Sequence, residues 1–204
     1  MNDFSLEELI PVLVEVIESG GEFRLYPRGT SMLPLLRQGI DSVALIAPDG
    51  KRRRGEILLY RRSNGQYVLH RLVRIGKNGS LQFSGDNHKD LENGIANAQI
   101  IATVTAVFRG EKRKDVNSPG MRLYAFVLSH QCSKRLFLFA RRALAYIKRN
   151  CKYNEKSIGI ILWTLFSIGF GRHSKALFEF LVEVAAVFVS DMVEDLSNRH
   201  IGAL

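Results

Sequence analysis

Short apolar segments separated by tight-turn signals dominate the first half of this 204-residue chain. Over these segments the side-chain pattern changes to the period of two that a β-strand requires. Asn64-Gly65 and Asn78-Gly79 are typical of two-residue hairpin turns, whose central positions favour positive φ. Closely spaced strands joined in this way form antiparallel sheets or small barrels. We predict strands at 22–27, 42–48, 56–62, 67–76, 80–85 and 99–108.

A helix is predicted before these strands, over 5–19. Ser5 and Glu8 have the spacing of a capping box, and Gly20-Gly21 provides a stop. Pro11 indicates a kink or a later start. We expect this helix to pack on its own domain rather than on a membrane, because its polar side is acidic. Its apolar face consists of Leu6, Leu9, Ile10, Leu13, Val16 and Ile17.

The second half of the chain has a different charge pattern. Between Met121 and Asn154 there are eight Lys/Arg residues and no Asp or Glu, and over 121–150 apolar and basic residues recur with a helical period. This predicts a basic amphipathic helix, either docked on its own domain or contacting anionic lipid headgroups. The segment 174–197 is amphipathic and acidic, which suits it to lie against the basic helix. The basic side chains include Lys134, Arg135, Arg141, Arg142, Lys148 and Arg149.

These patterns predict an α+β chain in three parts. They are an N-terminal amphipathic helix at 1–21, a mostly antiparallel β domain at 22–112 and a helical region at 113–204. The formal net charge of +9 favours an anionic partner such as a membrane surface. No recognition motif accompanies the charge, so we do not expect nucleic acid. Cys132 and Cys151 are far apart and predict free thiols, with neither a disulfide framework nor a metal site.

Neither a secretory signal nor a membrane span is expected. Asp3, Glu7 and Glu8 precede any basic residue, which is not the pattern of a signal peptide. The longest uncharged apolar run, 157–171, has 15 residues, whereas a bilayer span needs about 20. We therefore expect a protein of the cytoplasm or of the membrane periphery.

Three residue types in the β region form a candidate catalytic set. Gly29 permits a sharp bend and Pro34 fixes φ, so Ser31 is predicted to lie in a stiff turn, as a nucleophile requires. His70 lies in a predicted strand, and Asp86 follows another strand. Each residue alone is more often explained by an ordinary structural role. Together they supply the hydroxyl, the imidazole and the carboxylate that acyl transfer uses.

Four boxes in order resemble the type I signal peptidase family. Most bacterial members have a Lys-Arg pair at the base, whereas the endoplasmic-reticulum-type branch has His-Arg, as this chain does. The spacing of 39 residues from Ser31 to His70 also resembles that branch, and the match covers about 22–110. The boxes are Gly29-Thr30-Ser31-Met32-Leu33-Pro34, Arg54-Gly55-Glu56-Ile57-Leu58-Leu59-Tyr60, Val68-Leu69-His70-Arg71-Leu72 and Gly85-Asp86-Asn87.

The resemblance implies a role for each of these residues. Ser31 would be the nucleophile, and His70 the general base and then the general acid. Asp86 would orient His70, with Asp90 as the alternate carboxylate. The Ser31 N–H would be an oxyanion donor, assisted by Thr30 or by backbone alone. The family resemblance also implies a β-rich core, no cofactor or metal, and an extended peptide or protein substrate that pairs with an exposed strand.

Departures from the family keep other functions open. Gly29 stands where the family often has a serine, Glu56 replaces the aspartate of the Gly-Asp box, and no N-terminal anchor is evident. We therefore expect a soluble or peripheral, membrane-associated bacterial relative that trims a particular peptide or leader segment. The alternatives are a self-cleaving repressor-type protease, a catalytically silent peptide-binding module, and a basic scaffold for membranes or nucleic acid.

Overall fold

The computed structural model describes residues 5–130, 133–135, 137–138 and 141–142. The helices and strands named below all lie in the first of the chain's two units, Met1–Arg135. The helices are α1 (Leu6–Glu18), the short 3₁₀ helix η1 (Asn97–Gln99) and α2 (Pro119–Ser129). The strands are β1 (Phe23–Leu25), β2 (Asp41–Ile46), β3 (Ile57–Arg61), β4 (Tyr67–Ile75), β5 (Leu81–Ser84), β6 (Glu92–Ile95), β7 (Ile100–Arg109) and β8 (Lys112–Asp115).

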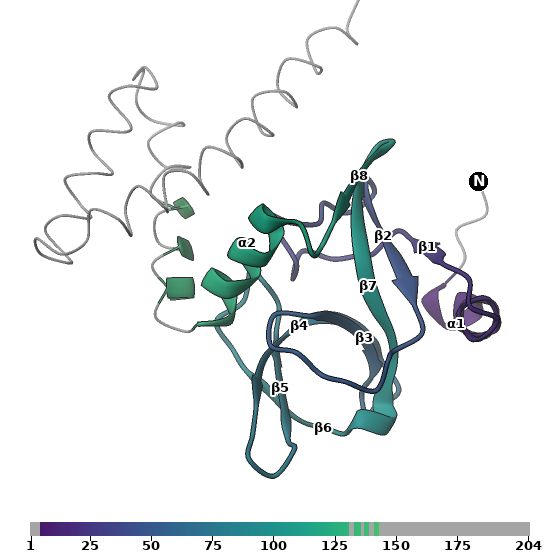
Figure 1. Cartoon of the computed structure of the whole chain (residues 1–204), viewed down its shortest axis with the longest axis horizontal. Helices are drawn as coiled ribbons and strands as arrows, with labels where there is room; N and C mark the ends of the chain where they lie inside the picture. Colours follow the sequence, from purple (N-terminus) through teal and green to yellow (C-terminus); the bar gives the residue numbers. More distant parts are fainter. Residues whose placement is uncertain (1–4, 131–132, 136, 139–140, 143–204) are drawn as a thin grey trace, which may run out of the picture. The chain divides into compact units, whose positions relative to one another are not determined.

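The described strands form one antiparallel sheet. Their order is β1-β2-β7-β3-β4-β5-β6, and β8 pairs with β7. Figure 1 shows α1 beside β1 and α2 beside β4, which agrees with the contacts between these elements. The predicted α+β class, with an N-terminal helix and a mostly antiparallel sheet, is confirmed.

All six predicted strands are present, as β1 to β5 and β7. The two predicted hairpin turns are also present, since Gly65 and Gly79 have φ values of 89° and 77°. Two strands were not predicted. β6 contains Asn-Gly, and β8 consists of four charged residues, so neither has strand propensity. β8 forms because a turn at Gly110, with φ 57°, folds the chain back onto β7.

The N-terminal helix forms as its capping signals predict. The Ser5 side chain accepts a hydrogen bond from the Glu8 N–H, and the Glu8 carboxylate accepts one from the Ser5 N–H. The helix begins at Leu6 and includes Pro11, so the proline does not delay its start. The residues that it buries are Ile10, Leu13 and Ile17.

The core of the sheet surrounds the strand that carries His70. Buried side chains from β3, β4, β5, β6 and β7 form one cluster, and Val68 packs against it. Because side chains alternate along β4, His70 lies on the same face as Val68 and Leu72. The cluster consists of Leu58, Tyr60, Leu72, Leu81, Phe83, Ile95 and Ile100.

A buried ion pair joins β4 to the loop after β5. The Arg71 guanidinium donates to both carboxylate oxygens of Asp86, at 2.8 and 2.7 Å, and to the Gly55 carbonyl at 2.7 Å. The Arg71 and Asp86 side chains are 2% and 0% exposed. The Tyr124 ring of α2 lies 5.3 Å from the guanidinium carbon. Arg71 therefore connects two loops and a helix to the strand of His70.

Several predictions about the C-terminal half lie outside the described residues. The expected helix over 121–150 is seen in part as α2, and the predicted boundary at residue 113 falls within β8. Cys132, Cys151 and the segments 157–171 and 174–197 are not among the described residues. In the part that is described, no helix is both long enough and apolar enough to cross a membrane.

Replacing one member of the buried pair should strongly destabilise the fold. We expect Arg71→Met to lower the free energy of unfolding by about 3–5 kcal/mol, because the Asp86 carboxylate stays buried without its partner. Urea denaturation of the purified chain measures this loss.

The matched control is Arg53→Met. Arg53 pairs with Asp49 on the surface, where their side chains are 62% and 52% exposed, so unfolding should change little. The double variant Arg71→Met/Asp86→Leu should recover much of the loss, because no unpaired charge remains buried. Equal effects of Arg71→Met and Arg53→Met would contradict this account.

Candidate active site

Ser31 lies in a turn that is bonded to the loop after β5. Its carbonyl oxygen accepts the Asn87 N–H at 2.8 Å, and the Thr30 carbonyl accepts the Asn87 side-chain amide at 3.2 Å. Gly29 has φ 92°, a conformation that favours glycine. The following residues Met32, Leu35 and Leu36 are buried and anchor the turn in the core. The predicted stiff turn is therefore present.

Gly85 lies between Ser31 and His70. A Cβ atom on Gly85 would lie 3.0 Å from the Ser31 Cβ, 3.2 Å from the His70 Nε2 and 2.6 Å from the Ser31 carbonyl oxygen. Residues that are distant in sequence thus meet at one point, and the missing side chain leaves the space between them. The Nε2 atom is the ring nitrogen that faces this side.

His70 is held neutral by its surroundings. It is 7% exposed, and burial, which disfavours the charged imidazolium, lowers its pKa to about 4. The nearby Glu92 carboxylate acts in the opposite direction but does not offset burial. A general base must be unprotonated at its working pH. His70 meets that condition at neutral pH.

One cavity of about 300 Å³ is lined by both Ser31 and His70. Its lining includes the apolar residues Met32 and Leu36 and residues 67–69 of β4. Residues 27–29, which lead into the serine turn, also line it, together with Arg62 and His88. A peptide placed in this cavity would therefore meet the hydroxyl and the imidazole together.

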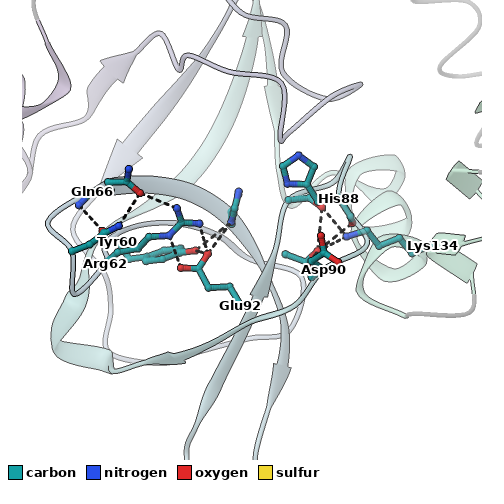
Figure 2. Close-up of polar contacts among 11 residues, drawn as sticks. Tyr60, Arg62, Gln66, His88, Asp90, Glu92 and Lys134 are labelled. Atoms are coloured by element: carbon teal, nitrogen blue, oxygen red, sulfur yellow. Dashed lines mark hydrogen bonds and ion pairs between the residues drawn. The ribbon is translucent and has the colours of Figure 1, made fainter.

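The two predicted aspartates lie in different settings, and neither hydrogen-bonds to His70 among the described contacts. Asp86 is fully buried, and Arg71 occupies both of its carboxylate oxygens. Asp90 is exposed, and its backbone carbonyl accepts the Ser84 hydroxyl at 2.8 Å. Figure 2 shows Asp90 beside His88 and Lys134, apart from the group of Tyr60, Arg62 and Glu92.

A third carboxylate, which the sequence analysis missed, lies closest to the His70 ring. Glu92 Oε2 is 3.6 Å from Nδ1 and accepts the Tyr60 hydroxyl at 2.8 Å. Arg62 donates to both Glu92 oxygens at 2.6 Å, and Figure 2 shows these contacts. Burial opposes ionisation of Glu92, but the hydrogen bonds from Arg62 and Tyr60 outweigh it and hold the Glu92 pKa below its usual value.

Glu92 was missed because it lies on the unpredicted strand β6. The available signal is its position six residues after Asp86, in a segment with several acids. Only the pairing of Phe83 with Glu92 places this side chain next to β3 and β4. That register is not readable from a strand containing Asn-Gly.

Lys134 is buried, although the sequence analysis placed it on the basic side of an amphipathic helix, facing either solvent or lipid headgroups. That placement is wrong for this residue, which is 2% exposed. Its Nζ atom donates to the Ser84 hydroxyl and to the Gly85 carbonyl, both at 2.7 Å. Figure 2 shows these contacts as dashed lines that end at Lys134. Burial lowers the Lys134 pKa to about 8. The amine thus holds the strand end next to Ser31 and His70.

The expected oxyanion donors are the Ser31 N–H and the Thr30 hydroxyl. Among the described contacts, neither the Ser31 N–H nor the Thr30 hydroxyl has a hydrogen-bond partner. A free backbone N–H beside the nucleophile is what an oxyanion hole requires. Thr30 is exposed, so its hydroxyl is less constrained than the backbone donor.

No other described feature offers a stronger chemical site. The described residues contain no group of three or more His, Cys, Asp or Glu side chains suited to a metal ion. A larger cavity of about 700 Å³ lies between α2 and strands β3 and β7, and its lining includes neither Ser31 nor His70. The candidate site is therefore the smaller cavity, which both Ser31 and His70 line.

No family model, curated protein or solved structure matches this chain. The resemblance to signal peptidases therefore stays a prediction, and the argument for function depends on the geometry of the site.

We predict that His70 remains neutral down to about pH 4. The folded pKa is lowered, so between pH 6.5 and 4 the unfolded chain binds a proton that the folded chain does not. The contribution of His70 to the free energy of unfolding is therefore fully present above pH 6.5 and is lost as the pH falls toward 4. The loss is a few kcal/mol at most, since one pKa unit corresponds to about 1.4 kcal/mol.

NMR titration of the histidine ring protons measures this pKa, and urea denaturation at each pH measures its linkage to stability. His70→Gln should remove this part of the pH dependence, which appears as a flatter curve between pH 6.5 and 4. A His70 ring that titrates at 6.5 or above would show that the fold does not suppress its charge.

Proposed function

We propose that this chain is a serine endopeptidase, similar in chemistry to signal peptidases, with Ser31 as nucleophile and His70 as general base. The observation that carries the proposal is that the Ser31 side chain and the neutral His70 Nε2 both lie next to Gly85 and line one cavity. A hydroxyl beside a neutral, oriented imidazole is the minimum set for nucleophilic catalysis.

The reaction would proceed by acyl transfer. His70 Nε2 accepts the proton of the Ser31 hydroxyl as its oxygen attacks the scissile carbonyl. The Ser31 N–H stabilises the resulting oxyanion. His70 then gives the proton to the leaving amine, and a water molecule, activated by the same nitrogen, releases the acyl group from Ser31.

An extended peptide or leader segment is the substrate class that suits this cavity. Residues 27–29 and 67–69 line it, and the backbone of an extended peptide bound there would hydrogen-bond to these segments. The family resemblance adds small residues just before the cut. Contact with an anionic membrane surface stays a separate prediction, because most of the basic segment lies outside the described residues.

A catalytically silent peptide-binding module is the second candidate. The observation that favours it is that no hydrogen bond joins the Ser31 hydroxyl to His70 among the described contacts. Such bonds are often long in the absence of substrate and tighten only in the complex. The enzyme is therefore the preferred conclusion.

Incubation of the purified full chain with a complex peptide mixture tests the proposal. Mass spectrometry of newly formed N-termini should reveal a set of cleavages with a common sequence pattern. We expect Ser31→Ala and His70→Ala to lower the cleavage rate by about three orders of magnitude or more, because the two groups act as one unit.

The matched control is Ser63→Ala, which removes an exposed turn hydroxyl and should cleave like the wild type. Circular dichroism establishes that each variant is folded. Peptides that are bound by the wild type but never cut would favour the binding module. Cleavage that survives Ser31→Ala would refute Ser31 as the nucleophile.

A further inference from the structure

A tyrosine hydroxyl stands between the candidate base and its nearest carboxylate. His70 Nδ1 lies 3.2 Å from the Tyr60 hydroxyl oxygen and 3.6 Å from Glu92 Oε2. The same hydroxyl lies 2.8 Å from that carboxylate oxygen. The imidazole is therefore hydrogen-bonded to the tyrosine and only indirectly to the acid.

The single proton of the tyrosine hydroxyl decides the direction of both hydrogen bonds. Arg62 donates to both oxygens of Glu92, so this carboxylate is an acceptor only. Tyr60 must then donate its proton to Glu92, and its oxygen is left to accept from His70. The His70 Nδ1 atom therefore carries the ring hydrogen, and Nε2 presents a lone pair on the side of Gly85 and Ser31.

The fold holds Tyr60 in this position. On the β3–β4 ladder Tyr60 pairs with Val68 and Leu58 pairs with His70, so the tyrosine is a diagonal neighbour of the histidine on one face. A register shift after Leu59 in the pairing with β7 sits next to it, and such irregularities often re-aim a side chain. The Tyr60 ring is fully buried and lies 4.5 Å from that of Phe83.

We propose that Tyr60 is a positioning residue of the site: with Glu92 and Arg62 it holds His70 in the tautomer whose Nε2 accepts the Ser31 proton. This inference rests on the proposed function and adds a residue to it. Tyr60 touches neither the hydroxyl nor the substrate, and acts through the imidazole. The hydrogen-bonded series runs from His70 through Tyr60 and Glu92 to Arg62.

Tyr60 neither gains nor loses a proton during the proposed reaction. When Nε2 takes the Ser31 proton, both ring nitrogens of His70 carry hydrogen, and the Nδ1–H stays bonded to the Tyr60 oxygen. The Tyr60 proton stays on its own oxygen, facing Glu92. The new positive charge on the ring is partly balanced by the Glu92 carboxylate 3.6 Å away. The ring then returns the Nε2 proton to the leaving amine.

The tautomer can be measured without any substrate. In the full chain labelled with ¹⁵N-histidine, the wild type at pH 7 should show His70 with a protonated Nδ1 and an unprotonated Nε2, assigned by loss of the signals in His70→Gln. Tyr60→Phe keeps the ring against Phe83 and removes only the hydroxyl. We expect it to give a mixture of the two tautomers.

Glu92→Gln provides a sharper test. Because Arg62 only donates, the glutamine carbonyl should turn toward it, and the amide NH₂ should then donate to the Tyr60 oxygen. Tyr60 would in turn donate to His70 Nδ1, so the hydrogen moves to Nε2 and the tautomer reverses. Tyr26→Phe, at an exposed position, should leave the wild-type tautomer in place.

Activity on a peptide cleaved by the wild type gives the second readout. Tyr60→Phe should lower kcat about tenfold or more, and Glu92→Gln by several orders of magnitude, as a reversed tautomer does in a serine triad, with KM little changed. Two results would overturn the inference: an Nε2–H tautomer of His70 in the wild type, or the same tautomer in the wild type, Tyr60→Phe and Glu92→Gln. Because NMR needs no turnover, absence of cleavage by the wild type would count against the proposed function alone.

Discussion

The buried pair of Arg71 and Asp86 is the contact on which the rest of the site depends. Arg71 follows His70 on β4, and Asp86 follows Gly85 at the end of β5. Their two hydrogen bonds, at 2.8 and 2.7 Å, hold the strand of the base against the residue that separates it from Ser31. The N–H of Asn87, the next residue, donates a hydrogen bond to the Ser31 carbonyl oxygen. The pair therefore fixes the positions of His70 and Ser31 relative to one another, and the opposite charges of Arg71 and Asp86 compensate each other.

Around His70, unlike in the Arg71–Asp86 pair, the buried ring is neutral and the charges lie on the groups next to it. The imidazole itself is buried and neutral, with its pKa near 4. The charged groups next to it, Glu92 and Arg62, compensate one another through two hydrogen bonds of 2.6 Å. This arrangement keeps a carboxylate close enough to stabilise a transient imidazolium without protonating the ring in the resting state. As a result, the His70 imidazole is neutral at neutral pH and able to accept a proton.

Much of this could be predicted from the sequence, and the failures have physical causes. Turn residues and alternating apolar segments are local signals, so six strands, two hairpins and the helix cap were predictable. The turn that holds Ser31 was also predictable, because Gly29 permits a sharp bend and Pro34 fixes φ nearby. Its meeting with His70 was implied only by the family resemblance. β6 and β8 were not predictable, because tertiary pairing rather than propensity creates them.

The same limit explains the carboxylates and the lysine. Asp86 was chosen because Gly-Asp-Asn follows a strand, but sequence alone does not show that Arg71 occupies both of its oxygens. Glu92 reaches His70 through the register of an unpredicted strand. Lys134 belongs to a segment whose composition is typical of a solvated helix face, yet its side chain is buried and donates to the Gly85 carbonyl. In each case a long-range contact, invisible in a local pattern, determines the role.

The measurement that tests the central claim most directly is the rate of covalent labelling of the full chain by a small fluorophosphonate, followed by intact mass from pH 3 to 8. The account predicts a single adduct on Ser31, absent from Ser31→Ala, with a rate that falls below about pH 4 as His70 gains a proton, and a much lower rate in His70→Ala at every pH. An adduct at another residue, no adduct at Ser31, or a rate that His70→Ala leaves unchanged would contradict it.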